Sequence, residues 1–114
     1  MTEVESCIIV GAGIAGLLAA QRLMRYDIKV TLIEKSRGYG GRMAVKTIGD
    51  STFDAGAQFM TTRDLIFRER VESWLAQGEV LPWYPGPLRN MRYVGSHGMT
   101  TVPNRIGKSL DVRL

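Results

Sequence analysis

Residues 10–17 read VGAGIAGL, and their three glycines, Gly11, Gly13 and Gly16, follow the pattern G-x-G-x-x-G. The first glycine of this pattern permits a tight turn, and the second lets the backbone approach a phosphate closely. The third lets a helix pack closely on a strand, and the N-terminus of that helix offers unpaired N–H groups to the anion. The stretch predicts a strand-to-helix turn that binds a dinucleotide, although the pattern also fits a tight turn without a ligand.

The residues on either side of the glycines predict the strands and the helix that such a turn needs. Residues 6–10, SCIIV, form a short apolar run typical of a strand buried on both faces of a parallel sheet. Residues 14–25 are rich in helix-forming residues and predict a helix. Residues 28–34, IKVTLIE, predict a second strand. Together these segments predict a βαβ unit, and therefore an α/β, Rossmann-like fold class.

Glu34 ends the second predicted strand and lies 18 positions after Gly16, as 34 minus 16 shows. An acidic residue about 20 positions beyond the glycines accepts hydrogen bonds from the ribose of a bound dinucleotide. A carboxylate at this place also repels a 2′-phosphate, which favours FAD or NAD over NADP. The alternative is that Glu34 is a solvated charge at the end of a strand.

A second glycine cluster, KSRGYGGRM at residues 35–43, follows this acid directly. Because glycine has no Cβ, the main chain of such a cluster can run close to a planar or phosphorylated group. Arg42 adds a fixed fork of donors that suits pyrophosphate oxygens or a flavin edge. The first cluster does not distinguish FAD from NAD, whereas the second favours FAD.

The middle of the chain predicts a hairpin followed by a helix. Residues 43–60 alternate weakly around a Gly-Asp pair, which favours a β-hairpin or meander. Residues 61–77 predict a helix whose start is capped by Thr61 or Thr62.

The last third of the chain predicts shorter elements. Residues 79–90 contain three of the four prolines and predict an irregular extended segment. Residues 91–98 predict a strand, and residues 99–110 a short helix that Pro103 interrupts. Residues 111–114, DVRL, are the candidate for a third parallel strand beside the first two. Because no helix follows them, we expect the chain to be the N-terminal portion of a longer protein. The alternative is an isolated folded product of 114 residues.

Composition narrows the possible ligands and locations. The net charge of +4 suits an anionic ligand, but the basic residues are scattered, so we expect no nucleic-acid binding. One cysteine and one histidine exclude a disulfide framework and a His/Cys metal cluster. The N-terminus is unlike a signal peptide, and no apolar run approaches the ~20 residues that span a bilayer. We therefore expect a cytoplasmic protein that contacts no membrane.

The stretch VGAGIAGLLAA…VTLIEKSRGYGGRM resembles the flavin-containing amine oxidase superfamily. Its continuation FDAGAQFMTTRD, followed by VESWL and then RYVGSHGM, looks most like the renalase branch of that superfamily. The resemblance implies that residues 1–114 are an N-terminal FAD-binding portion of a two-domain fold that binds FAD and NAD(P). Its parts would be the dinucleotide-binding βαβ unit at 6–34, the Gly-Gly-Arg loop at 35–43, and the first elements of a substrate domain from about 61 to 114.

The resemblance also implies which residues contact FAD. The first glycine cluster would lie along the pyrophosphate, Glu34 and Lys35 near the adenosine, Arg42 between pyrophosphate and flavin, and Gln58 and Phe59 at the flavin ring. The full set of candidate FAD-binding residues is Gly11, Ala12, Gly13, Ile14, Ala15, Gly16, Glu34, Lys35, Arg37, Gly41, Arg42, Met43, Gln58 and Phe59.

The renalase resemblance implies hydride transfer from an isomeric dihydronicotinamide form of NAD(P)H to the flavin, with reoxidation by dioxygen to hydrogen peroxide. One alternative is oxidation of a primary or secondary amine, and another is a nucleotide-binding module without catalysis. No acid, base or nucleophile constellation is visible, so no catalytic residue is assigned. The sequence favours His97 as a surface loop residue and Trp74 as a core residue, and leaves Trp83 as a candidate for lining a substrate pocket.

Overall fold

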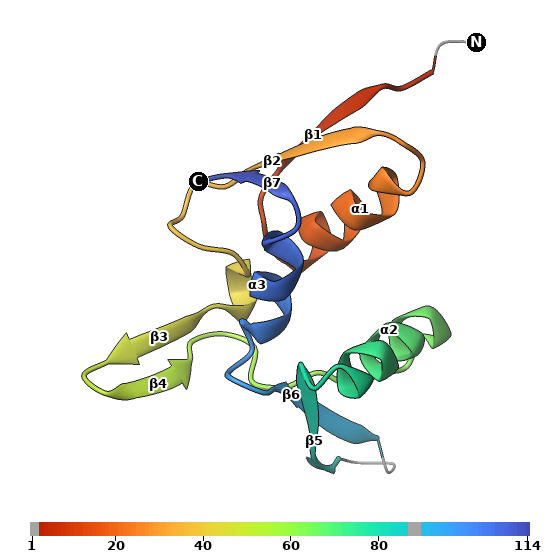
Figure 1. Ribbon diagram of the computed structural model, residues 1–114. Helices are drawn as coiled ribbons and strands as arrows, with labels where there is room; N and C mark the ends of the chain where they lie inside the picture. The colour runs from red at the N-terminus through yellow and green to blue at the C-terminus, as the bar shows by residue number, and fades with distance from the viewer. Residues whose placement is uncertain (1–2, 87–89) are drawn as a thin grey trace. The chain divides into compact units, whose positions relative to one another are not determined.

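The computed structural model describes residues 3–86 and 90–114, and the chain divides into two compact units (Figure 1). The first unit comprises Met1–Arg42 and Pro103–Leu114, and the second comprises Met43–Val102. Each unit has its own β-sheets and its own buried side chains.

The first unit contains a parallel sheet built around the glycine-rich turn. Its elements are β1 (Ser6–Val10), α1 (Ile14–Met24), β2 (Lys29–Ile33) and β7 (Asp111–Arg113). The helix α3 (Thr101–Gly107), which belongs to this unit from Pro103 on, leads into β7. The three strands lie in the order β1-β2-β7, and both pairings are parallel. In Figure 1 the blue strand from the end of the chain accordingly lies beside the orange β2. The predicted βαβ unit, the third parallel strand and the Rossmann-like α/β fold class are confirmed.

The two faces of this sheet differ in burial. On one face α1 packs against the sheet, and Leu17 of α1 and Leu32 of β2 are fully buried. Ile9 faces α1 as well, since its side chain lies next to Gly16. By alternation Ile8 and Val10 face the other way, where they are 65% and 85% exposed. The prediction that this strand is buried on both faces is therefore wrong, because the described chain covers only one face.

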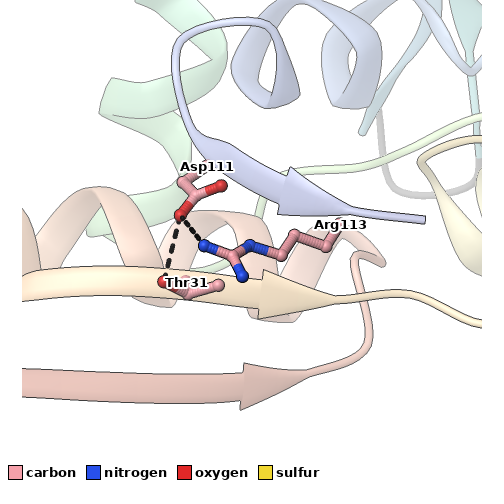
Figure 2. Close-up of polar contacts among 3 residues, drawn as sticks. All are labelled: Thr31, Asp111 and Arg113. Atoms are coloured by element: carbon pink, nitrogen blue, oxygen red, sulfur yellow. Dashed lines mark hydrogen bonds and ion pairs between the residues drawn. The ribbon is translucent and has the colours of Figure 1, made fainter.

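Polar side chains join β2 to β7 on the surface of the sheet (Figure 2). The Thr31 hydroxyl donates to Asp111 Oδ2 at 3.1 Å, and the Arg113 guanidinium lies 3.6 Å from the same oxygen. All three side chains are at least partly exposed. Such solvated contacts contribute little to stability, so the backbone ladder and the buried face of the sheet hold β7 in place.

The second unit consists of two hairpins and a helix. Its elements are β3 (Val45–Ile48), β4 (Ser51–Asp54), α2 (Leu65–Ala76), β5 (Val80–Pro85) and β6 (Met91–Gly95), preceded by the short 3-10 turn η1 (Gly41–Met43). β3 pairs with β4 and β5 with β6, both antiparallel. α2 packs on β5, and Val71, Trp74 and Val80 are buried there. The predicted hairpin, helix and strand in this part of the chain are confirmed.

The start of α2 differs from the prediction. The Asp64 carboxylate accepts the Phe67 N–H at 3.0 Å, so Asp64 caps the helix and the helix begins at Leu65. The prediction of a cap at Thr61 or Thr62 is wrong. Asp64 combines a strong capping side chain with a negative charge at the positive end of the helix dipole, which a threonine lacks.

The proline-containing segments are more regular than predicted. Val80–Pro85 is a strand, with an irregular register between Pro82 and Pro85, where a missing N–H is tolerated. Pro103 does not interrupt α3, because it lies in the first turn, where a backbone N–H needs no partner within the helix. Residues 87–89, which belong to the segment predicted to be irregular, lie outside the described residues.

Two further findings concern residues 3–86 and 90–114. In these residues, no helix has both the length and the apolar character needed to cross a membrane. In the same residues, no group of three or more His, Cys, Asp or Glu side chains is placed to hold a metal ion. Cys7 is a free and half-buried thiol.

Candidate dinucleotide-binding site

The first glycine cluster forms a tight turn between β1 and α1. Gly11 has a φ of +101°, a backbone conformation that side-chain-bearing residues rarely adopt. Its N–H donates to the Ile33 carbonyl at 2.8 Å, which ties the turn to the end of β2. A Cβ on Gly16 would overlap the Gly11 carbonyl oxygen and lie 3.2 Å from Ile9 Cγ2. The first and third glycines of the motif are therefore required by the backbone geometry itself.

The turn leaves the N-terminus of α1 without a side-chain cap. Gly13 is the N-cap residue, and it has no side chain to accept a bond from the first turn. The first intrahelical bond runs from Leu17 N–H to the Gly13 carbonyl at 3.0 Å. The first turn also contains no acidic residue. This end of the helix can therefore receive an anion through its free N–H groups and the positive end of its dipole.

Glu34 holds the turn from the side of β2. Its Oε1 accepts the Ala12 N–H at 2.8 Å, and its Oε2 accepts the Ser36 N–H at 2.8 Å and the Ser36 hydroxyl at 2.9 Å. The bond from the Ala12 N–H, followed by those from Ser36, lowers the pKa of Glu34 below its usual value. Glu34 is therefore ionised at neutral pH.

The same bonds limit what Glu34 can accept from a ligand. A carboxylate offers about four acceptor positions. The Ala12 and Ser36 N–H groups use two of these positions, and the single proton of the Ser36 hydroxyl is shared between Glu34 and the Gly38 carbonyl. About one or two positions are left for a ribose hydroxyl. Sequence reasoning missed Ser36. The available signal was a serine two residues after an acidic side chain, a spacing at which local side-chain bonds to the backbone are common.

The two glycine clusters meet backbone to backbone. Gly40 N–H donates to the Ala12 carbonyl at 2.9 Å, and Gly40 forms a parallel bridge with Gly13. Gly41, with a φ of +53°, is so close to Gly13 that a Cβ on Gly41 would lie 3.4 Å from the Gly13 Cα. The second cluster thus runs directly along the first. A side chain at Gly13 or Gly41 would lie between the two segments.

The remaining predicted site residues fall in two places. Lys35, Arg37 and Arg42 belong to the first unit, and all three are exposed. Met43, Gln58 and Phe59 belong to the second unit, where Met43 is buried and the other two are exposed. The structure brings together Gly11–Gly16, Glu34 and Gly41, and adds Ser36 and Gly40 to them.

The structure also shows the surroundings of Trp74 and His97, two residues discussed in the sequence analysis. Trp74 is buried in α2 and contacts Phe67 edge-on, as expected for a core residue. His97 is exposed, and its Nδ1 lies 3.2 Å from the Ser96 hydroxyl, as expected for a surface loop. Asp54, which sequence reasoning did not single out, accepts the Met99 N–H at 2.8 Å and so ties β4 to the turn after β6.

Residues 9–74 match the family described as NAD(P)-binding Rossmann-like domain. This match covers more than half of the 114 residues, and it includes both glycine clusters and Glu34. The chain belongs to this family.

Individual relatives extend the comparison. Protein anon-37Cs of Drosophila lebanonensis is 30% identical over 100 residues, which are 87% of this chain and 18% of that protein. The 1-hydroxycarotenoid 3,4-desaturase of Flavobacterium sp. (strain P99-3) is 39% identical over 62 residues, or 54% of this chain and 13% of the desaturase. A solved structure of wild-type putrescine oxidase bound to putrescine is similar with a TM-score of 0.54 and 25% identity, over 82% of this chain and 22% of the oxidase. The chain spans about a fifth or less of the length of these proteins.

Proposed function

We propose that this chain is the FAD-binding portion of a FAD-dependent oxidoreductase related to the amine oxidases. The observation that carries the proposal is the junction of the two glycine clusters, at which Gly40 bonds to Ala12 and Gly13 lies against Gly41. One cluster at a helix N-terminus suits any dinucleotide, whereas a second cluster beside it suits a cofactor with a further planar group. The similarity to a desaturase and to putrescine oxidase supports an oxidoreductase.

In this proposal each group of predicted site residues contacts a different part of FAD. Gly11 to Gly16, with Ala12, Ile14 and Ala15 between the glycines, hold the pyrophosphate at the start of α1. Glu34 and Lys35 hold the adenosine side, and Arg42 binds between pyrophosphate and flavin. The remaining proposed contacts are Arg37, Gly41, Met43, Gln58 and Phe59.

For the reaction we propose renalase-like oxidation of an isomeric dihydronicotinamide form of NAD(P)H. When bound, FAD supplies the hydride acceptor, and dioxygen then takes up the electrons to give hydrogen peroxide. Loss of hydride turns the dihydropyridine ring into an aromatic pyridinium, so the driving force lies in the substrate. The residues of this chain then have to bind and orient the cofactor rather than supply a strong base. The single free cysteine is in keeping with a reducing, cytoplasmic location.

A second candidate is oxidation of a primary or secondary amine. The similarity to putrescine oxidase in complex with putrescine favours it. An amine reaches a flavin only in its unprotonated form, so this reaction needs surroundings that favour the neutral amine. A nucleotide-binding module without catalysis is the third candidate.

The experiment that separates the candidates begins with FAD reconstitution of the purified protein. A yellow protein is then mixed anaerobically with dihydronicotinamide isomers and, separately, with simple amines. We expect the flavin absorbance to bleach with a dihydronicotinamide isomer and to return when air is admitted. Bleaching by amines alone would replace the renalase-like reaction with amine oxidation. A folded protein that remains colourless after reconstitution would support the non-catalytic module instead.

A further inference from the structure

Three aromatic rings and one arginine form a cluster on the second unit, which we call the aromatic–arginine cluster: Phe59, Trp83, Tyr84 and Arg92. Trp83 and Tyr84 are neighbours in β5, and their ring centroids lie 4.6 Å apart. Phe59 lies 6.4 Å from Trp83 between ring centroids. Paired backbone bonds between Met60 and Tyr93, each 2.8 Å, hold the segment of Phe59 against β6. The cluster is therefore built on a hydrogen-bonded framework.

Arg92 lies between two of these rings. Its guanidinium carbon is 4.8 Å from the centroid of Phe59 and 4.6 Å from that of Tyr84. Gly86 also lies against it, since a Cβ there would be 3.2 Å from Arg92 Cζ and Nε. Cation–π contacts of this kind hold the plane of a guanidinium in position. They occupy its faces and leave the N–H groups on its edge available as donors.

The charge of Arg92 has no partner of opposite sign in the described part of the chain. Across residues 3–86 and 90–114, its side chain forms neither an ion pair nor a hydrogen bond. The three rings beside it remain 39%, 52% and 42% exposed for Phe59, Trp83 and Tyr84. A positioned cation with free donors amid exposed aromatic surface is suited to a ligand that is both anionic and planar.

We propose that the aromatic–arginine cluster binds the anionic group, carboxylate or phosphate, of a small planar ligand. An oxyanion receives charge-assisted hydrogen bonds from the guanidinium edge, while a planar ring contacts the exposed aromatic faces. An ammonium group is repelled at the same place. This inference rests on the function proposed above. The cluster would favour binding of an acidic substrate over a cationic one, and therefore of a dinucleotide over an amine.

The test uses three matched probes that share one ring: benzoate, benzamide and benzylamine, which are anionic, neutral and cationic. Inorganic phosphate is the fourth probe and reports the anion without the ring. Affinities are measured by calorimetry on the purified protein, and a change in tryptophan emission that disappears in Trp83→Phe locates the bound probe. We expect benzoate to bind at least tenfold more tightly than benzamide, phosphate to bind weakly, and benzylamine not to bind.

Variants of Arg92 decide whether the arginine binds a ligand or only separates the rings. Arg92→Gln keeps a planar group between the rings but removes the charge, and it should weaken benzoate binding about tenfold or more, as expected for a lost charge-assisted hydrogen bond. Arg92→Lys keeps the charge and should retain part of the affinity. Arg68→Gln, at an exposed arginine of α2, is the matched control and should bind benzoate like the wild type.

Several outcomes would overturn the inference. These are equal affinity of the wild type and Arg92→Gln for benzoate, equal affinity of the wild type for benzoate and benzamide, or a Trp83 signal from benzylamine alone. If Arg92→Gln fails to fold, the salt dependence of the wild type decides, because raising NaCl from 20 to 200 mM should weaken benzoate binding and leave benzamide unchanged. FAD content, read from the same samples, separates the two proposals. A wild-type protein that holds FAD but does not bind benzoate contradicts only the cluster, and a wild-type protein that binds benzoate but holds no FAD contradicts only the proposed function.

Discussion

The two candidate sites of this protein are built from different parts of the polypeptide. In the first unit the glycine clusters meet through main-chain atoms, with Gly40 N–H bonded to the Ala12 carbonyl and Gly41 against Gly13. In the second unit, side chains make the aromatic–arginine cluster, and they come from three separate segments. A site made of backbone requires glycines at fixed positions, so it is visible as a motif. A site made of side chains has no required spacing, so it becomes visible only when the chain folds.

The largest effect in this comparison should come from a methyl group placed inside the first turn. In Gly16→Ala the new Cβ would overlap the Gly11 carbonyl oxygen, so β1 and α1 would have to move apart. We expect a loss of at least 1–3 kcal/mol in the free energy of unfolding, measured by urea denaturation, and loss of FAD binding. Gly38→Ala, with nothing within 4 Å of the added Cβ, is the control and should unfold like the wild type. Equal stability of the two variants would show that the clusters tolerate side chains.

The second glycine cluster should affect FAD retention more than folding. Arg42→Ala should lower FAD content through the loss of charge-assisted bonds of about 1.5–3 kcal/mol. Gly41→Ala should lower it as well, because its φ of +53° strains a residue with a Cβ, and the methyl group would stand next to Gly13. The measurement is the ratio of flavin to protein absorbance after gel filtration. Wild-type FAD content in both variants would contradict the role proposed for this loop.

Glu34 should make the free energy of unfolding of the first unit depend on pH in the acidic range. Its pKa is lowered in the folded state by hydrogen bonds from Ala12 and Ser36, so its contribution is complete above the unfolded-state pKa and is lost as the pH falls through the folded value. When the pH is lowered below about 4.3, the usual pKa of a glutamate, the urea concentration at the midpoint of denaturation should decrease. We expect this decrease to be steeper in the wild type than in Glu34→Gln. Parallel pH profiles would show that the tie to Ala12 does not stabilise the turn.

The smallest effect should come from the surface contacts between β2 and β7. Asp111→Asn weakens the interactions with Thr31 and Arg113, all in contact with solvent (Figure 2). We expect a change in unfolding free energy of 0–1 kcal/mol. A thermal denaturation series in low and high salt measures it. A loss larger than that of Gly16→Ala would mean that side chains, rather than the packed backbone, hold the first unit together.

Local rules predicted most elements well, and two of the errors share a cause. Apolar periodicity and turn residues predicted β1, β2, β6, β7, α1, α2 and the first hairpin. The proline-rich segment was predicted as irregular because prolines disfavour strands, yet pairing with β6 overrides that preference in β5. The cap of α2 was assigned to a threonine, although Asp64 supplies both the acceptor and the charge. Each of these two errors concerns competing preferences of the chain that local propensity alone does not resolve.

The sequence by itself determined the βαβ unit, the turn at Gly11–Gly16 and the place of Glu34, because these depend on short-range backbone geometry and on glycine's missing Cβ. Only the tertiary structure decided that the second glycine cluster lies along the first, that the Ala12 N–H donates to the Glu34 carboxylate, and that Arg92 lies between Phe59 and Tyr84. The physical reason is that a contact between distant segments depends on how far each strand runs and which way each side chain points. Those quantities are set by packing across the whole unit rather than by neighbouring residues.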